Sequence, residues 1–399
     1  MKIAIDALPI MSQKTGIGYY THHLISQFVT IAPDDDFYLC DVLFESPFCT
    51  IVKLGNDLSN AYQFIRISKV PFPFVTFTRF LFFIQQKLIG KAPKIEEMDI
   101  FFGPNYRGIF KESMRTVITI HDMVHKYFPE TIGGENLKYL TNKLPNIAKK
   151  AHCVITDSES TKNDIIKLLN VPEEKVKVIY LGVDGVFKPL IDTKALASVK
   201  KRYGLPEKFI LFLGTIEPRK NIQGLMKAYA KLCEETSFNH DLVLAGDIQW
   251  KSGGLKNLIK DLRFVDRVRF IGYVDETDLA NLYNLADIFV YPSFYEGFGL
   301  PIIEAMACGV PVVTSNTSSL PEIAGNAAVL IDPHSIDDLA QGIKRVLSDN
   351  ELRQNLIRSG LERAKLFTWE KCAREIMKVF KELLSNRGEN IVSDTLVTL

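Results

Sequence analysis

The chain has 399 residues, of which 48 are Lys or Arg and 47 are Asp or Glu, so its formal net charge is +1. The length predicts two domains, and the balanced charge excludes a global field that would attract nucleic acid. Six scattered cysteines without a C-x-x-C pair exclude a zinc-site spacing and indicate reduced cytoplasmic thiols.

The chain begins with MKIAIDALPI, which predicts a β-strand and lacks the long apolar core of a signal peptide. We therefore expect a cytoplasmic protein. The aromatic segment at residues 70–90 contains Pro71, Pro73 and Arg79, so its unbroken apolar part is well short of the roughly 20 residues that a membrane span needs. We interpret it as a buried or groove-lining helix, with peripheral contact at the inner membrane face as the alternative because its phenylalanines are so concentrated.

The N-terminal part contains four apolar runs that end in Gly, Asp, Asn or Ser, namely KIAIDAL, DIFFGPN, TVITIHD and HCVITDS. Parallel sheets place ligand-contacting loops at such strand ends, so we predict a Rossmann-like α/β domain over residues 1–188. Gly16 and Gly18 follow the first strand, but Thr21 replaces the last glycine of G-x-G-x-x-G. A dinucleotide fingerprint is therefore absent, although a glycine-rich loop near a diphosphate is still expected.

Residues 189–208 carry little strand signal and are predicted to be a linker. From 209 to 367, six apolar runs alternate with amphipathic helical patterns: FILFLGTI, DLVLAGD, RVRFIGYV, ADIFVYPS, VPVVTS and AAVLIDP. This alternation predicts a second doubly wound parallel sheet. An amphipathic helix is expected at about 368–385, followed by a mobile polar tail at 386–399.

The segment LFLGTIEPRKNIQGL places Arg219 and Lys220 between the end of a strand and the start of a helix. Two cations in this position can hold a phosphate or diphosphate through charge-assisted hydrogen bonds. A solvated surface pair is the alternative. His121, at the end of TVITIHD, can either donate to a sugar hydroxyl or be a buried, hydrogen-bonded histidine.

The segment YEGFGLPIIEAMACG places Glu296 in a loop and Glu304 in the first turn of a helix that starts near Pro301. Eight residues of unbroken helix would separate the two carboxylates by about 12 Å, so the glycine turn must bring them into one cleft. Gly297 and Gly299 leave backbone N–H groups open to a ligand. The alternative is that Glu304 stabilises the helix start and Glu296 lies at the surface. The histidines show no metal-like spacing, so no metal site is assigned.

The segment EGFGLPIIEAMACGVPVV resembles the E-x7-E region of the retaining family 4 glycosyltransferases. LGTIEPRKN, SSLPEIAGNAAVLIDP and FTWEKCAREI are similar to further segments of that family in the same order. The resemblance implies the GT-B fold, an α/β fold of two facing Rossmann-like domains with a C-terminal helix crossing back to the first domain. The EPRKN form of the loop is similar to that of GDP-mannose-dependent mannosyltransferases.

The resemblance also implies a role for each site residue. Arg219 and Lys220 would bind the nucleotide diphosphate and Glu304 the ribose hydroxyls. The donor sugar would meet Glu296 and the backbone of Gly297, Phe298, Gly299 and Leu300. From the opposite domain, Gly16 and Gly18 would line the diphosphate and His121 would contact the transferred sugar. Many members have an arginine where this chain has Thr215, so Arg219 would carry that role alone.

The implied activity is transfer of a hexose, with mannose from GDP-mannose favoured, to a glycan or lipid-linked glycan in cell-surface polysaccharide biosynthesis. Retention is consistent with a front-face route or with a covalent intermediate on Glu296. Neither a metal nor a cofactor beyond the donor is expected. Open alternatives are a UDP-sugar donor, a nucleotide-sugar epimerase and a non-catalytic sugar-nucleotide binder. A glycoside hydrolase also pairs carboxylates, but it has no need of the Arg219 and Lys220 loop.

Overall fold

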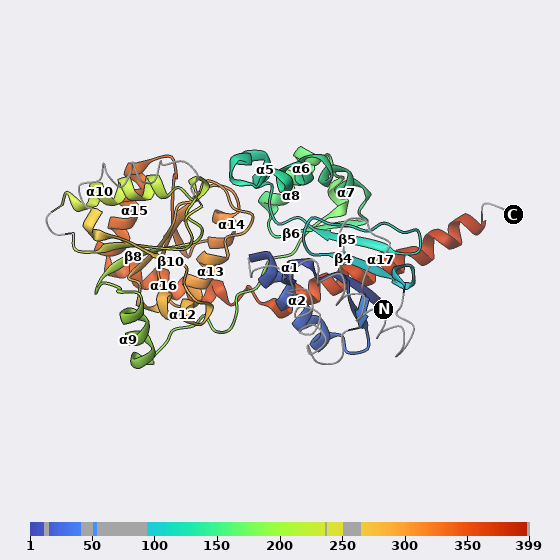
Figure 1. Ribbon diagram of the computed structural model, residues 1–399, viewed down its shortest axis with the longest axis horizontal. Coiled ribbons are helices and arrows are strands. Elements are labelled where there is room, and N and C mark those ends of the chain that lie inside the picture. Colours follow the sequence, from blue (N-terminus) through green and yellow to red (C-terminus); the bar gives the residue numbers. More distant parts are fainter. Residues whose placement is uncertain (12–15, 41–50, 54–93, 236–237, 250–264, 397–399) are drawn as a thin grey trace, which may run out of the picture.

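The computed structural model describes residues 1–11, 16–40, 51–53, 94–235, 238–249 and 265–396. Two lobes lie side by side, and each contains a sheet with helices packed around it (Figure 1). The aromatic segment at 70–90 lies outside the described residues, so its predicted helix and membrane contact stay predictions.

The N-terminal sheet has the strand order β3-β2-β1-β4-β5-β6-β7. Its strands are β1 (Lys2–Asp6), β2 (Asp36–Cys40), β3 (Ile51–Lys53), β4 (Ile100–Gly103), β5 (Arg115–Thr119), β6 (Cys153–Thr156) and β7 (Val176–Val178). All neighbours pair in parallel except the edge strand β3, which runs antiparallel to β2. The four predicted strands are confirmed as β1, β4, β5 and β6, and the central strands are buried on both faces because helices cover them.

The helices of this lobe are α1 (Leu8–Met11), α2 (Gly16–Ile31), α5 (Val124–Tyr127), α6 (Gly134–Asn142), α7 (Leu144–Lys150) and α8 (Glu159–Leu169). The inner face of α2 buries Tyr20, Leu24 and Phe28. Its first turn follows the β1 strand end, which brings Gly16 and Gly18 to the same edge of the sheet as the ends of β5 and β6.

The C-terminal sheet has the order β10-β9-β8-β11-β12-β13, which is the doubly wound order of the first sheet repeated. Its strands are β8 (Phe209–Leu213), β9 (Asp241–Ala245), β10 (Val268–Gly272), β11 (Ile288–Tyr291), β12 (Val312–Ser315) and β13 (Ala328–Ile331). Each of the six apolar runs in the sequence forms one of these strands. The prediction of two Rossmann-like parallel sheets is confirmed.

The helices around this sheet are α9 (Thr193–Arg202), α10 (Ile222–Cys233), α12 (Glu276–Leu285), α13 (Leu300–Ala307), α14 (Leu320–Ala324), α15 (Ile336–Ser348) and α16 (Asn350–Ala364). The predicted linker at 189–208 contains α9, which the sequence pattern did not indicate. Asp192 caps this helix by accepting from Lys194 N and Ala195 N. Arg202 and Tyr203 then bond the carboxylate of Asp278 on α12 at 2.6 and 3.0 Å, which fixes α9 to the C-terminal lobe.

The final helix α17 (Trp369–Leu396) crosses back to the N-terminal lobe, as predicted (Figure 1). Trp369 stacks on His23 of α2 with ring centroids 4.7 Å apart, and Phe380 contacts Phe28 and Phe102 at 6.1 and 5.5 Å. The helix extends past its predicted end at about 385 to Leu396, while the predicted mobility of 386–399 stays a prediction. Extending a helix that already exists avoids the cost of nucleation, and no proline interrupts these residues.

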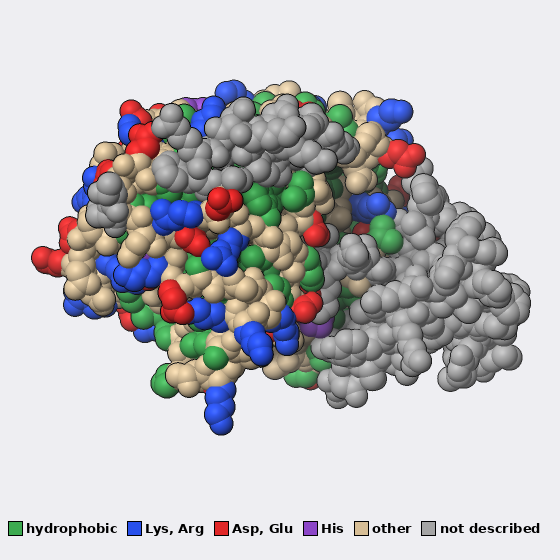
Figure 2. Space-filling model, turned by 60° about the vertical axis from the view of Figure 1, so that its left-hand side comes forward, with side chains coloured by type: hydrophobic (Ala, Val, Ile, Leu, Met, Phe, Trp, Pro, Cys, Tyr) green, Lys and Arg blue, Asp and Glu red, His purple; other side chains and the backbone are tan. Residues whose placement is uncertain are grey.

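Lys and Arg side chains are interspersed with Asp and Glu over the described surface in Figure 2, as the balanced composition predicts. Within the described part of the chain, no helix is long and apolar enough to cross a bilayer. Cys153, Cys233, Cys308 and Cys372 are buried free thiols, and the Cys40 side chain is also buried.

Candidate functional site

A buried charge cluster lies where β8 and β11 end. Arg219 and Lys220 belong to a short 3-10 turn (Pro218–Lys220) after β8, and Glu296 belongs to the loop after β11. Lys220 Nζ lies 2.6 Å from Glu296 Oε1, and Arg219 Nη1 lies 3.0 Å from Oε2. Lys220 is 7% exposed and Glu296 8%. The solvated-surface alternative for this pair of cations does not fit that burial.

Neighbouring groups fix the two cations. Lys220 Nζ donates to the Tyr291 hydroxyl, and Arg219 donates to Glu217 and, at 2.7 Å, to the backbone oxygen of Tyr295. Arg219 Nε is a buried donor for which the described residues provide no partner. An anionic ligand oxygen would satisfy such a donor.

The local chain path explains how Arg219 and Lys220 face Glu296. Asn221 adopts a left-handed conformation with φ of 57°, which asparagine tolerates better than most residues. Its side chain accepts from Gly224 N and so caps α10, while its amide nitrogen donates to Pro333 O at 2.7 Å. This turn ends the 3-10 segment and starts α10, so the two cations lie directly beside the end of the strand.

The electrostatics favour an ionised cluster at neutral pH. Burial alone would raise the pKa of Glu296, but Arg219 and Lys220 outweigh it and lower that pKa to about 2. Burial and the neighbouring Arg219 lower the pKa of Lys220, while Glu296 opposes this shift. Both oxygens of Glu296 are therefore held as acceptors by the cations predicted to bind the diphosphate.

Glu304 lies apart from this cluster on α13. Because α13 begins at Leu300, Glu304 is its fifth residue, about one position beyond the predicted first turn. Its Oε2 accepts from the Tyr283 hydroxyl at 2.8 Å, and burial raises its pKa to about 7. Burial raises the pKa of the Tyr19 phenol on α2, and the Glu276 carboxylate and, more weakly, the Glu304 carboxylate add to this shift.

The loop between Glu296 and α13 requires glycine at two positions. A Cβ on Gly297 would lie 2.0 Å from the backbone oxygen of His121, and Gly299 has φ of 105°. The Phe298 ring packs against Tyr180 and Phe367, with centroids 6.3 and 5.7 Å away, so a ligand would meet its backbone. Leu300 opens α13, where Pro301 has no N–H and Ile302 N donates to Gly299 O at 3.0 Å, so only the other N–H groups of this first turn lack intrahelical partners.

The other predicted donor contacts lie at the edges of this region. Gly16 and Gly18 are the first and third residues of α2, so they form a helix N-terminus, not the predicted loop. No atom lies within 4 Å of the position that a Cβ on Gly16 would occupy, and this leaves room for a ligand. Thr215 is half-buried just after the end of β8.

The His121 ring is fully engaged within the N-terminal lobe. Nδ1 lies 2.7 Å from Asp157 Oδ2 and Nε2 lies 2.9 Å from Pro104 O, and both partners are acceptors. Burial alone would lower the pKa of His121, but the Asp157 carboxylate outweighs it and raises that pKa. The alternative of a buried, hydrogen-bonded histidine describes this arrangement, whereas the predicted sugar contact stays a prediction that needs Nε2 to exchange partners.

The sequence pattern gave no indication of a set of side chains that join the two lobes at the Glu296 loop. The Tyr295 hydroxyl donates to Asp164 Oδ2 of α8 at 2.7 Å, and the Ser158 hydroxyl donates to Gly297 O at 2.7 Å. Tyr295 could have been found as the neighbour of Glu296. Asp164 gave no signal, because it is 131 residues from its partner.

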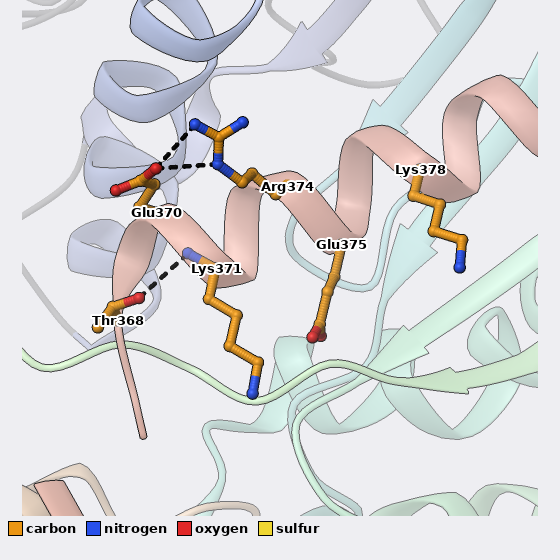
Figure 3. A pocket seen from close by; sticks show the side chains of 6 residues that line it. All are labelled: Thr368, Glu370, Lys371, Arg374, Glu375 and Lys378. Carbon is orange, nitrogen blue, oxygen red and sulfur yellow. Dashed lines mark hydrogen bonds and ion pairs between the residues drawn. The ribbon is translucent and has the colours of Figure 1, made fainter. Parts of the chain in front are cut away.

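A separate hollow of about 320 Å³ lies on α17 and is lined by Thr368, Glu370, Lys371, Arg374, Glu375 and Lys378 (Figure 3). Arg374 pairs with Glu370 of the same helix at 2.8 Å, and both side chains are more than half exposed. Exposed pairs of this kind contribute little energy, so we do not place the site there. The described residues contain no group of three or more His, Cys, Asp or Glu side chains suited to a metal ion.

Known proteins match both lobes. The family described as Glycosyl transferases group 1 matches residues 197–363, and Glycosyltransferase Family 4 matches residues 50–185. O-antigen chain mannosyltransferase B of Escherichia coli is 37% identical over 284 residues, covering 71% of this chain and 74% of that protein. Serotype-specific mannosyltransferase WbdA of the same species is 32% identical over 69% of this chain, which spans only 34% of WbdA.

Solved structures share the architecture. Sucrose-phosphate synthase from Thermosynechococcus elongatus superposes with a TM-score of 0.68 at 22% identity, covering 97% of this chain and 100% of that one. Anabaena HepE, solved with UDP and glucose, gives a TM-score of 0.63 at 20% identity over 96% of this chain and 100% of its own. Together with the relatives and the paired sheets, these matches show that the chain is a glycosyltransferase of family 4 with the GT-B fold.

Proposed function

We propose that the protein transfers mannose from GDP-mannose, with retention at the anomeric carbon, to a glycan or lipid-linked glycan acceptor in cell-surface polysaccharide biosynthesis. The choice of mannose is supported by the 37% identity to the O-antigen chain mannosyltransferase. The structural neighbours that carry UDP are only 19–20% identical, so they inform the fold and leave the donor base open.

The observation that carries the proposal is that Arg219 and Lys220 both contact Glu296 in the buried charge cluster. Glu217 and Glu296 balance the two cations in the unliganded protein. A diphosphate would bring its own negative charge to Arg219 and Lys220, including the unpartnered Arg219 Nε. We propose that Glu296 then accepts hydrogen bonds from hydroxyls of the donor sugar.

The same cations would supply the catalysis. As the bond between C1 and the diphosphate oxygen breaks, negative charge grows on the departing diphosphate. Arg219, Lys220 and the backbone N–H groups at the start of α13 are fixed before the reaction begins, so they can stabilise this charge without reorganising. We propose that this charge stabilisation proceeds without a metal ion.

For retention, we favour the front-face route. A covalent route would require Glu296 to attack C1, but we propose that its oxygens accept hydrogen bonds from hydroxyls of the donor sugar, which makes this carboxylate a weaker nucleophile. In the front-face route, the departing phosphate takes the proton of the acceptor hydroxyl on the face from which it leaves. Glu304 would bind the ribose hydroxyls, while Gly16, Gly18 and His121 would approach the donor from the N-terminal lobe.

We place the acceptor on the N-terminal lobe and the protein in the cytoplasm, with peripheral contact at the inner membrane face if the acceptor is lipid-linked. Flotation with liposomes tests this contact, and a protein that stays at the bottom of the gradient would contradict it.

The test of the donor is a thermal-shift and turnover screen with GDP-mannose, UDP-glucose, UDP-GlcNAc and UDP-galactose. A donor that binds only the native protein raises its Tm. We expect GDP-mannose to give the largest increase in Tm. We also expect it to be the only one of the four donors whose sugar is transferred to a glycan acceptor. Stabilisation and turnover with a UDP-sugar instead would refute mannose. Conversion of the donor without acceptor would indicate an epimerase, and binding without turnover would indicate a non-catalytic binder.

A further inference from the structure

Tyr295 connects the charge cluster to the opposite lobe. Its backbone oxygen accepts from Arg219 Nη1 at 2.7 Å, and the next residue is Glu296. Its hydroxyl leaves the C-terminal lobe, donates to Asp164 Oδ2 at 2.7 Å and accepts from Met123 N at 3.2 Å. One residue therefore touches the cluster through its backbone and the N-terminal lobe through its side chain.

The partner of Tyr295 is itself held in place. Asp164 lies on α8, and its second oxygen, Oδ1, accepts from the Tyr127 hydroxyl at 2.6 Å. The Tyr127 and Tyr295 rings pack at 4.9 Å. Tyr127 and Asp164 both belong to the N-terminal lobe, so only the Tyr295 bond to this carboxylate crosses between lobes.

The first turn of α8 holds the same loop at a second point. The Ser158 hydroxyl donates to Gly297 O at 2.7 Å, and the Glu322 carboxylate of α14 accepts from Glu159 N at 2.9 Å. Gly297 follows Glu296 in the chain, so separation of the lobes would remove a contact of the loop that carries Glu296.

We propose that Tyr295 and Asp164 are a positioning pair, which sets the Glu296 loop and the Arg219 side chain in their reactive geometry only when the two lobes are closed. Neither residue touches the reacting atoms. The pair acts through the Tyr295 backbone, because a displacement of about 1 Å in a reacting group can slow a reaction by about a hundredfold. The kinetic part of this inference rests on the proposed function.

The experiment compares Tyr295→Phe with Tyr127→Phe, since both remove a hydroxyl from the same carboxylate and keep the ring. Turnover of GDP-mannose is measured as GDP release, affinity is measured by calorimetry with GDP, and the opening of the lobes by small-angle X-ray scattering without ligand. We expect Tyr295→Phe to lower kcat by about tenfold or more, to change the Kd for GDP by less than about twofold, and to increase the radius of gyration. Tyr127→Phe keeps the bond between the lobes and removes only a support of the Asp164 carboxylate, so it should change kcat and the radius of gyration much less than Tyr295→Phe does.

Asp164→Asn and the double variant Y295F/D164N complete a cycle. Both residues act through one contact. The kcat of the double variant should therefore be no lower than that of the less active single variant. Additive losses, or a Tyr295→Phe protein that matches Tyr127→Phe in kinetics and scattering, would overturn the proposal. A wild-type protein inert toward GDP-mannose would instead refute the proposed donor, and the scattering comparison would then decide whether the pair holds the lobes.

Discussion

The two lobes share a strand order but differ in the charged groups at the ends of their strands. At the C-terminal strand ends, Arg219 and Lys220 face Glu296, and Arg219 Nε keeps an unused donor. At the N-terminal strand ends, His121 is neutralised by Asp157, with its second ring nitrogen at a backbone oxygen. We propose that the first arrangement exchanges partners for an anion, whereas both ring nitrogens of His121 already have partners within their own lobe.

This difference indicates a division of labour. The cations that we propose bind the diphosphate belong to the C-terminal lobe, and the proposed donor contacts of Gly16, Gly18 and His121 come from the other lobe. The described N-terminal lobe also touches the Glu296 loop, where His121 O lies close to Gly297 and Asp164 bonds Tyr295, and these are the closure contacts of our proposal. We expect changes in the cluster to affect every step and changes at the closure contacts to affect turnover more than binding.

The largest expected effect follows removal of a cluster cation. Lys220→Ala takes away one contact to the developing diphosphate charge, and kcat/KM with GDP-mannose should fall by about a hundredfold, or about 3 kcal/mol. Lys231→Ala is the matched control, because Lys231 lies on α10 in the same lobe and pairs with Asp337 at the surface. Retention of most of the wild-type kcat/KM by Lys220→Ala would refute the charge-stabilising role.

The next effect tests closure directly. Gly297→Ala would place a methyl group against His121 O, where a Cβ would lie 2.0 Å away, so the lobes cannot approach fully. We expect kcat to fall by at least about tenfold while the Kd for GDP stays near the wild-type value. Gly134→Ala serves as the control, since open space surrounds that glycine. An equal loss of GDP affinity and turnover in Gly297→Ala would contradict the expectation that contacts between the lobes affect turnover more than binding.

A smaller effect separates the two glutamates of the C-terminal lobe. Glu304 has a pKa raised to about 7, and its ionised form is the better acceptor for ribose hydroxyls. The KM for the donor should therefore decrease as the pH rises from 6 to 8. Glu304→Gln should weaken donor binding by about 1 kcal/mol and remove this dependence, whereas Glu296→Gln should chiefly lower kcat. Identical effects of the two substitutions on KM and kcat would contradict separate roles.

The smallest effect concerns stability through the N-terminal lobe. The Asp157 carboxylate raises the pKa of His121 above its ordinary value, so this pair stabilises the fold below about pH 6.5 and loses its effect as the pH rises through the raised pKa. Asp157→Asn should lower the free energy of unfolding at pH 5.5 by about 1 kcal/mol more than at pH 8. Urea denaturation at the two pH values measures this difference. An equal loss at both would mean that His121 is neutral throughout.

The sequence by itself determined the two parallel sheets, because strands buried on both faces must be apolar along their whole length and leave a pattern that needs no partner to be recognised. It also located Arg219, Lys220 and Glu296, since strand ends of such sheets meet at one edge. The path of α9 was missed because flanking glycine and proline outweighed its short helical run. The continuation of α17 to Leu396 was missed because its polar composition resembles a tail.

Only the tertiary structure decided which side chains pair within and between the two lobes. The sequence does not indicate that Tyr295 bonds Asp164, which is 131 residues away in the chain. It also does not indicate that both ring nitrogens of His121 bond groups within its own lobe. Local periodicity encodes burial along one element, whereas a hydrogen bond between distant side chains depends on how two finished lobes come together. The identity of the charged groups was therefore predictable, and their pairing was not.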